Sequence, residues 1–303
     1  MKKSISVLFC LLFLVSTSSS FASYPDLSNS IDGRLQYNLK KSLNKLGLSK
    51  PASNKKLALT LVDITDEANP KVAAVNGTEM MYAASLPKIA ILLGAFERIE
   101  NGTMKLDKRN HELLTRMIRN SSNTAATAML NKVGKNYLAK LLQSPRYKLY
   151  DKSKNGGLWV GKEYGRGSAF RRDPLHNISH GATAMQVARF YYFLETNRLV
   201  SAKLTKDMKE ILSKPAINHK FVKGLKSVQP SSEIFRKSGS WRQFHADSAI
   251  VERNGRRYIA VALAEDPKGG QWLSQLIVEM DKLIFSEPLE LAASSTGSPE
   301  PLL

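Results

Sequence analysis

The sequence predicts an α+β fold, in which an antiparallel five-stranded sheet is flanked by helices and carries an inserted all-helical lobe. Three observations support this prediction. Two β-rich segments precede a long block with helical periodicity, three strand signals follow that block, and an amphipathic helix comes last. Neither group of strands can bury a face alone, so we expect both groups to join in one sheet.

The first elements are a helix, a hairpin and a buried helix. Residues 27–48 have the apolar spacing of an amphipathic helix. Residues 57–63 are β-rich, and residues 72–75 follow a turn at Asn69-Pro70, which predicts an antiparallel pair. A nearly all-apolar helix is expected over residues 85–102, where the final glycine suits a C-terminal cap.

The rest of the chain completes the pattern. Residues 104–215 are mostly helical in pattern, apart from a loop over residues 144–181 that is rich in Gly, Arg and Lys. Strand signals return, with an Asn254-Gly255 hairpin turn, at Ile234–Ser240, Ala246–Arg253 and Arg256–Glu265. The closing helix has an apolar face made of Trp272, Leu273, Leu276, Ile277, Met280, Leu283 and Ile284.

This order of elements predicts one catalytic domain over residues 23–289. Its sheet lobe comprises residues 23–84 and 216–289, and its helical lobe comprises residues 85–215. A functional site is expected at the seam between the two lobes. Residues 290–303 are small, polar and proline-bearing, and we expect a disordered tail there.

The N-terminus has the pattern of an export signal. Lys2 and Lys3 precede an apolar run over residues 7–15, and Ser20-Phe21-Ala22 offers a cleavage site after position 22. The run is too short for a membrane anchor, which needs about 20 apolar residues. Cys10 lies inside the run, so a lipoprotein is not expected, and cleavage would remove the only cysteine. We therefore expect a periplasmic or secreted protein without a disulfide.

The formal charge of +19 restricts the partners. A basic protein suggests nucleic acid, but an export signal argues against that partner. Two explanations stay open: attraction to an anionic cell-wall surface, or a charge that only keeps the protein soluble. We expect a monomer that needs no cofactor.

A first motif, Ser85-Leu86-Pro87-Lys88, suits a nucleophile at the start of a helix. Proline is tolerated in a first turn, and the helix amides there favour a developing negative charge on the serine. A spacing of three puts Lys88 on the same face, where a buried lysine can take the serine proton. The motif alone is weak, because a capping serine followed by a lysine is common.

Two further motifs carry compatible chemistry. In Ser121-Ser122-Asn123, the first serine can relay a proton and the amide can hold the lysine, although a helix cap explains this motif better when it stands alone. In Lys237-Ser238-Gly239-Ser240, the lysine supplies positive charge, and the glycine lets substrate backbone approach the strand edge. The amides of Ser240 and Ser85 can form an oxyanion hole, in which one donor is worth about 3 kcal/mol.

Together and in this order, the three motifs resemble the signature of penicillin-recognising serine enzymes, which include the class A β-lactamases and their D,D-peptidase relatives. The resemblance covers nearly all of the chain after the leader, and Asn123-Thr124-Ala125-Ala126 and Asp247-Ser248-Ala249-Ile250-Val251 also match the family. It implies a five-stranded sheet lobe beside an all-α lobe. It also implies a nucleophile, a proton acceptor, a relay and substrate contacts, which are Ser85, Lys88, Ser121, and Asn123 with Lys237, Ser238 and Ser240.

One loop departs from this family. Class A enzymes carry a loop glutamate, followed by proline and later by asparagine, that activates the water releasing the acyl group. The closest match is Asp173-Pro174-Leu175-His176-Asn177, whose shorter side chain would leave the carboxylate about 1.5 Å away from its place. A misplacement of about 1 Å can cost 100-fold in rate. Asp173 is therefore the predicted fourth catalytic residue, and Glu163 is a competing candidate.

Other departures suggest a more open site that could admit a peptide strand. Ser85 and Ser121 are only 36 positions apart, and residues 149–170 have no counterpart in the family. His176 and His180 have the spacing of metal ligands on a helix, but they fall in a loop, so no metal site is expected. After the third motif, Trp241 can line the site and Arg242 can hold a substrate carboxylate; an exposed strand end explains them equally well.

Three functions follow from these observations. The preferred one is a secreted class A-type β-lactamase, which opens β-lactam amides through a Ser85 acyl-enzyme and then hydrolyses it. The second is a D,D-peptidase-like cell-wall enzyme that β-lactams acylate and that releases them slowly. The third is a wall-binding relative without turnover, against which the complete motifs argue.

Overall fold

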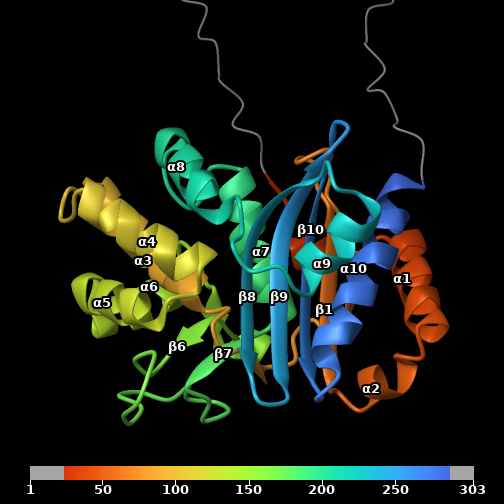
Figure 1. The fold of residues 1–303 in the computed structure, drawn as a ribbon, viewed down its shortest axis with the longest axis horizontal. Coiled ribbons are helices and arrows are strands. Elements are labelled where there is room, and N and C mark those ends of the chain that lie inside the picture. The colour runs from red at the N-terminus through yellow and green to blue at the C-terminus, as the bar shows by residue number, and fades with distance from the viewer. Residues whose placement is uncertain (1–23, 287–303) are drawn as a thin grey trace, which may run out of the picture.

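A five-stranded antiparallel sheet lies at the centre of the structure, a computed structural model that describes residues 24–286 (Figure 1). The predicted export signal and the predicted tail over residues 290–303 lie outside the described residues. The strands follow the order β2-β1-β10-β9-β8. Their bounds are Leu57–Asp63 (β1), Lys71–Val75 (β2), Glu233–Trp241 (β8), Phe244–Arg253 (β9) and Arg256–Glu265 (β10).

The two groups of strands join as the sequence predicts. Strand β1 pairs with β2 on one side and with β10 on the other, from Leu57 opposite Ala264 to Asp63 opposite Tyr258. Asn254 and Gly255 have φ values of 50° and 74°, the positive pair that a tight hairpin turn of this kind requires. The α+β fold with a five-stranded antiparallel sheet is confirmed.

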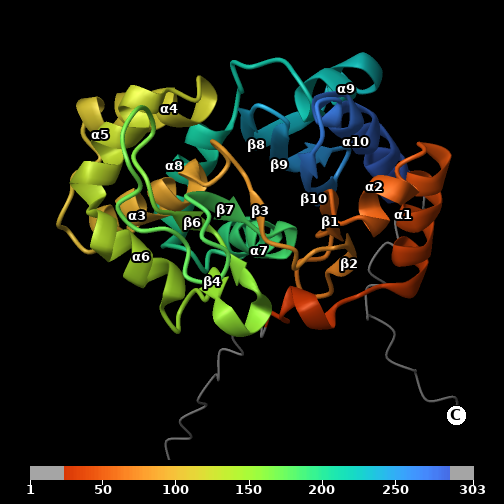
Figure 2. The same cartoon turned by 90° about the horizontal axis from the view of Figure 1, so that it is seen from below.

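Helices bury both faces of the sheet, which is why its central strands are almost continuously apolar. One face packs against α1 (Gly33–Lys45), α9 (Phe221–Val228) and α10 (Gly269–Phe285). The other face packs against α7 (Ala184–Glu195), as Figures 1 and 2 show from two directions. Along β10, alternate side chains therefore join two different cores.

A group of helices lies beside the β8 edge of the sheet (Figure 1). Its central member is α3 (Lys88–Glu100), whose first nine residues are all buried. Around it lie α4 (Lys108–Arg119), α5 (Asn123–Val133), α6 (Lys135–Gln143) and α8 (Ala202–Leu212). Helices α4 and α8 contact β8, so the edge of the sheet and the helical block meet directly.

Several predicted boundaries differ from the structure. The helix expected over residues 27–48 is divided into a 3₁₀ turn (Leu27–Asn29) and α1, because Asp32 caps α1 by accepting the Leu35 amide at 2.6 Å. The short helix α2 (Ser49–Ser53) follows beyond the predicted range. The helix expected from residue 85 begins at Lys88. Helix α7, which the prediction gave to the helical lobe, packs on the sheet, and this packing buries nearly all of its residues.

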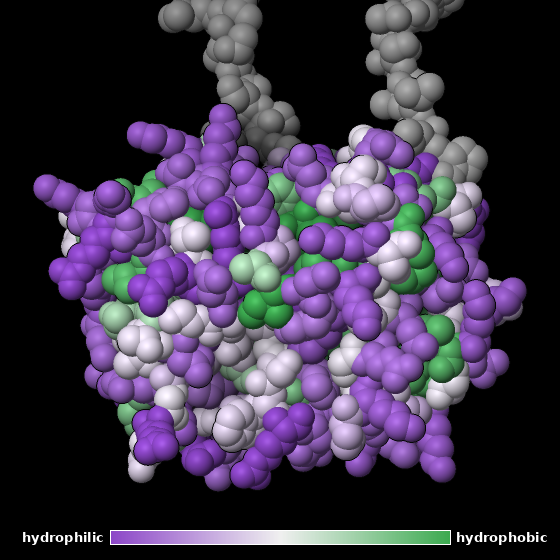
Figure 3. Space-filling view, viewed as in Figure 1, coloured by the Kyte–Doolittle hydropathy of each residue, from purple (hydrophilic) through white to green (hydrophobic). Residues whose placement is uncertain are grey.

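The loop predicted over residues 144–181 contains short strands. They are β4 (Tyr150–Asp151), β5 (Gly156–Gly157), β6 (Trp159–Val160) and β7 (His180–Ala182), and β7 pairs with β3 (Met81–Tyr82) just before Ser85. The face of the molecule seen in Figure 3 is mostly hydrophilic, in keeping with 45 lysines and arginines. Among the described residues, no helix has the length and apolarity that a membrane span requires.

Candidate active site

Ser85 lies in a tight turn between β3 and α3, half-buried in the wall of a cavity. The turn is strained, because Ala84 has a φ of 50°, a region that side-chain-bearing residues rarely adopt. A Cβ at Gly239 would lie 2.2 Å from the Ala83 carbonyl oxygen and 2.7 Å from the Ser85 amide nitrogen. The space that the sequence assigned to substrate backbone is therefore filled by the enzyme's own turn, which β8 holds in place.

Lys88 begins α3 and is fully buried. Its Nζ donates to the Ser121 carbonyl oxygen at 2.6 Å and to Asn123 Oδ1 at 2.9 Å, and it lies 3.4 Å from Ser121 Oγ. Burial lowers the pKa of Lys88 from 10.5 to about 7. In a large fraction of the molecules, Lys88 is therefore neutral near pH 7 and able to accept a proton.

Ser121 joins Lys88 to the third motif. Lys237 Nζ donates to Ser121 Oγ at 3.0 Å, so the hydroxyl lies between two amino groups. Ser121 adopts a φ of 56°, which shows that the surrounding structure holds it in an unfavourable conformation. Lys237 is fully buried, and burial, followed by the charge of Lys88, holds its pKa well below the usual value.

A third buried lysine, Lys220, supports Ser240 and was not predicted. Lys220 Nζ donates to Ser240 Oγ at 2.8 Å, to the Ala246 carbonyl at 3.1 Å and to the Gly239 carbonyl. Burial lowers the pKa of Lys220 to about 8. No motif marks this residue, because its partners come from β8 and β9 and are distant in sequence. It places a positive charge directly behind the predicted oxyanion donor.

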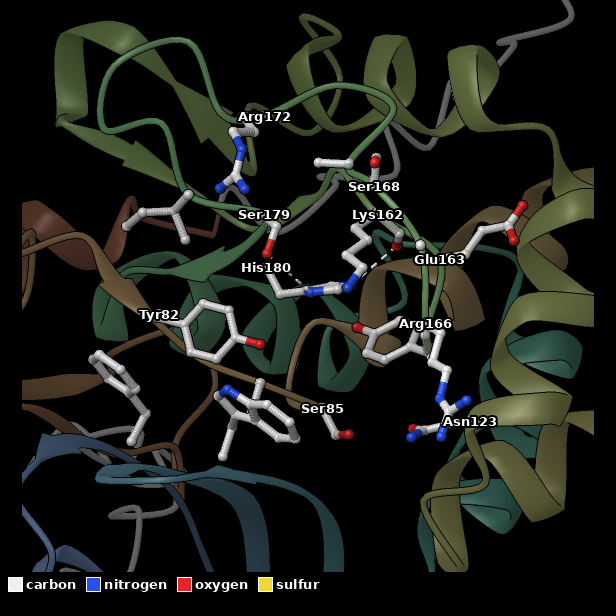
Figure 4. Close-up of a pocket in the computed structure, with 18 of the residues that line it drawn as sticks. Tyr82, Ser85, Asn123, Lys162, Glu163, Arg166, Ser168, Arg172, Ser179 and His180 are labelled. Atoms are coloured by element: carbon white, nitrogen blue, oxygen red, sulfur yellow. Dashed lines mark hydrogen bonds between the residues drawn. The ribbon is translucent and has the colours of Figure 1, made fainter.

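Ser85, Asn123 and Ser240 face one cavity of about 1000 Å³ (Figure 4). Ser238 and Arg242, predicted as substrate contacts, do not line it: Ser238 is buried, and the Arg242 guanidinium lies 5.8 Å from the centre of the Trp241 ring. The lining consists of Tyr82, Ala84, Ser85, Asn123, residues 162–169, Arg172, residues 177–180, Ser240, Trp241 and Phe244. Residues 149–170, which had no family counterpart, thus supply much of one wall.

The sequence model of the β-lactamase enzyme family matches residues 38–111 and 109–287, which is most of the chain. The chain belongs to the β-lactamase enzyme family. Membership makes it a hydrolase of the β-lactamase type. No curated protein matches the chain.

Several solved structures share the fold of this chain at low sequence identity. PBP-A is 17% identical, with a TM-score of 0.63 over 85% of this chain and 97% of PBP-A. A PBP-A mutant in an acyl-enzyme complex with penicillin G is 16% identical, with a TM-score of 0.62 over 84% and 96% of the two chains. A β-lactamase from Sphaerobacter thermophilus is 14% identical, with a TM-score of 0.63 over 81% and 96%.

The loop carboxylate predicted for a β-lactamase is turned away from the cavity. Asp173 is 2% exposed, does not line the cavity and accepts the hydroxyl of Tyr150. It also accepts the amide of Leu175 at 3.3 Å and that of His176 at 2.7 Å. These bonds use both oxygens of the carboxylate to fold its own loop, so the structure does not bring Asp173 together with Ser85 and Lys88.

The competing carboxylate, Glu163, lines the cavity but pairs with Lys135 on α6, and Figure 4 shows it pointing away from Ser85. The next residue, Tyr164, lies beside Lys88 instead, with Nζ 4.5 Å from the centre of its ring. Thr127 Oγ1 fixes Tyr164 by accepting its amide and donating to its carbonyl, both at 3.0 Å. An aromatic ring therefore covers the amino group of the general-base candidate.

The two histidines with metal-ligand spacing are separate in the structure. His176 Nε2 lies 3.3 Å from the Asn155 carbonyl, whereas His180 is buried against Tyr164 with ring centres 4.3 Å apart. Burial lowers the pKa of His180 to about 4. Within residues 24–286, no three His, Cys, Asp or Glu side chains gather as a metal site would require.

Proposed function

We propose that this β-lactamase-type hydrolase is acylated on Ser85 by β-lactams or by an equivalent amide of the cell wall, and that it releases the acyl group slowly. The observation that carries the proposal is the buried Lys88, held by Ser121 and Asn123 and bridged through Ser121 to Lys237. We further propose that residues 1–22 export the enzyme to the cell wall, where its basic surface suits an anionic matrix.

Acylation uses Ser85 and Ser240, which line the cavity, and the buried network of Lys88, Ser121 and Lys237. Neutral Lys88 takes the proton of the Ser85 hydroxyl, and the oxygen attacks the amide carbon. The amides of Ser85 and Ser240 stabilise the oxyanion that forms. As the carbon–nitrogen bond breaks, a proton passes from Lys88 through the Ser121 hydroxyl to the leaving nitrogen. Lys237 is the fixed positive charge that favours this transfer.

Slow release is supported by the surroundings of Lys88. Hydrolysis of the ester needs a water molecule and a group that takes its proton. Asp173 is committed to its own loop, Glu163 pairs with Lys135, and Tyr164 occupies the position against the lysine. A PBP-A mutant of similar fold was solved as an acyl-enzyme complex with penicillin G, which supports acylation by penicillin here. A D,D-peptidase-like cell-wall enzyme that releases β-lactams slowly is therefore favoured over an enzyme that turns β-lactams over rapidly.

Intact-mass measurement over time after addition of benzylpenicillin tests the proposal. We expect one adduct per molecule in the wild type that outlasts the addition by many minutes, and none in Ser85→Ala. Rapid return to the unmodified mass with consumption of the penicillin would restore the β-lactamase hypothesis. A wild type that never gains mass and does not cleave a D-Ala-D-Ala peptide would contradict the proposal.

A further inference from the structure

The cavity wall formed by the loop after β6 carries three positively charged side chains. Lys162, Arg166 and Arg172 all line the cavity; in Figure 4, Arg172 and Lys162 lie above Ser85, and the Arg166 side chain extends down beside Asn123. Lys162 is half-buried, and the two arginines are exposed. The sheet side of the cavity is different, since Tyr82, Trp241 and Phe244 make it largely aromatic. The cavity thus has an aromatic side and a basic side.

No carboxylate neutralises this basic wall. The acidic residue in the lining is Glu163, and its carboxylate is taken by Lys135. Among the residues that the structure describes, none of the three cations lies within 4 Å of an Asp or Glu oxygen. Arg172 Nη1 donates at 3.1 Å to the Asn177 carbonyl, a neutral partner that orients the guanidinium without cancelling its charge. Concave walls of one sign concentrate ligands of the other sign.

We propose that this wall is a subsite for a carboxylate on the side chain of the acyl donor, so that the enzyme prefers acidic peptides or acidic β-lactams. Arginine suits the task because its planar fork matches a carboxylate. A cavity of about 1000 Å³ also leaves room for a chain that extends from the reacting amide toward the loop. The inference rests on acylation of Ser85 and names the donor that this site selects.

Three penicillins that differ at one side-chain carbon provide the test. Carbenicillin carries a carboxylate there, benzylpenicillin carries hydrogen, and ampicillin carries an ammonium group. We expect second-order rates of Ser85 acylation to fall in that order, by about fivefold at each step. Screening predicts that the differences shrink in about 0.5 M salt.

Variants separate the effect of the basic wall on these rates from the effect of the protein's net charge. Arg166→Gln should reduce the carbenicillin-to-ampicillin rate ratio by about fivefold. The double variant, Arg166→Gln with Arg172→Gln, should reduce the same ratio by about 10-fold or more. Lys203→Gln with Lys206→Gln removes two exposed charges from α8 and should leave the ratio unchanged. The single variant alters an exposed side chain, so its folding is not in question.

The possible failures are distinguishable. Equal rates for the three penicillins in the wild type, or an unchanged ratio in the Arg166 and Arg172 variants, would overturn the subsite while leaving acylation of Ser85 intact. An equal fall in the α8 control would assign the preference to net charge and also overturn it. Failure of all three penicillins to modify Ser85 would overturn the proposed function, and the subsite with it.

Discussion

At the scale of single residues, Tyr164 controls the environment of Lys88. Attraction between an ammonium group and an aromatic ring, about 2 kcal/mol or more for a desolvated pair, favours the protonated lysine. Loss of water around the lysine has the opposite effect, and burial is the cause that lowers its pKa from 10.5 to about 7. The ring matters chiefly because it excludes water from the amino group.

Replacing Tyr164 with alanine should therefore raise the pKa of Lys88. Acylation requires the neutral lysine, so its rate rises with pH through this pKa. The acid limb of the pH–rate profile should move to higher pH, and the rate at pH 7 should fall by about fivefold for the first pKa unit and about tenfold for each further unit. Tyr164→Phe keeps the ring and is the control. Profiles for benzylpenicillin acylation that coincide in wild type and Tyr164→Ala would exclude this role.

At the scale of elements, the loop after β6 depends on Asp173. Its carboxylate accepts one hydroxyl and three backbone amides in a buried setting. Asp173→Asn replaces one acceptor with a donor that faces these groups, and we expect a loss of about 1–3 kcal/mol in the free energy of unfolding. Tyr150→Phe removes one of the same bonds and should cost less.

Release of the acyl group should not change in Asp173→Asn. Urea denaturation measures the free energy of unfolding of Asp173→Asn, and decay of the penicillin adduct measures its rate of acyl release. A variant of normal stability that holds the adduct at least tenfold longer than wild type would instead identify Asp173 as the base for hydrolysis.

The sequence predicted these elements unequally, for physical reasons. The span of β1 was predicted correctly, because burial of both sheet faces leaves an unmistakable apolar run. Ser85, Lys88, Ser121 and Lys237 follow local spacing, so the sequence could nominate them as candidates, and the last three form one hydrogen-bonded network in the structure. Asp173 also matched a family spacing, but the direction of its side chain depends on how the loop folds. Lys220 gave no signal, since its partners are carbonyls of distant strands.

At the scale of the whole molecule, we expect one buried and one partly buried histidine to make stability depend on pH. Burial lowers the pKa values of His180 and His219 from 6.5 to about 4. Between these values the unfolded chain binds protons that the folded protein does not, so the free energy of unfolding falls as the pH drops from 6.5 to 4. For His180 alone, the loss is on the order of 3 kcal/mol over that range.

His180→Phe should flatten this dependence while keeping a ring against Tyr164. Loss of the hydrogen bond to the Lys162 carbonyl lowers stability by an amount that does not vary with pH, so the slope is the informative quantity. Urea unfolding at several pH values between 4.5 and 6.5 measures it. Parallel curves for wild type and variant would mean that His180 titrates normally in the folded state.

The glycine at position 239 has a consequence for folding. The turn that carries Ser85 packs against β8 in the space that a side chain at Gly239 would fill, yet the two segments are more than 150 positions apart in the chain. A reactive serine therefore exists only after the helical block has docked on the sheet edge. Covalent capture of penicillin during refolding would time that docking, and so report the arrival of the native state independently of any spectroscopic probe.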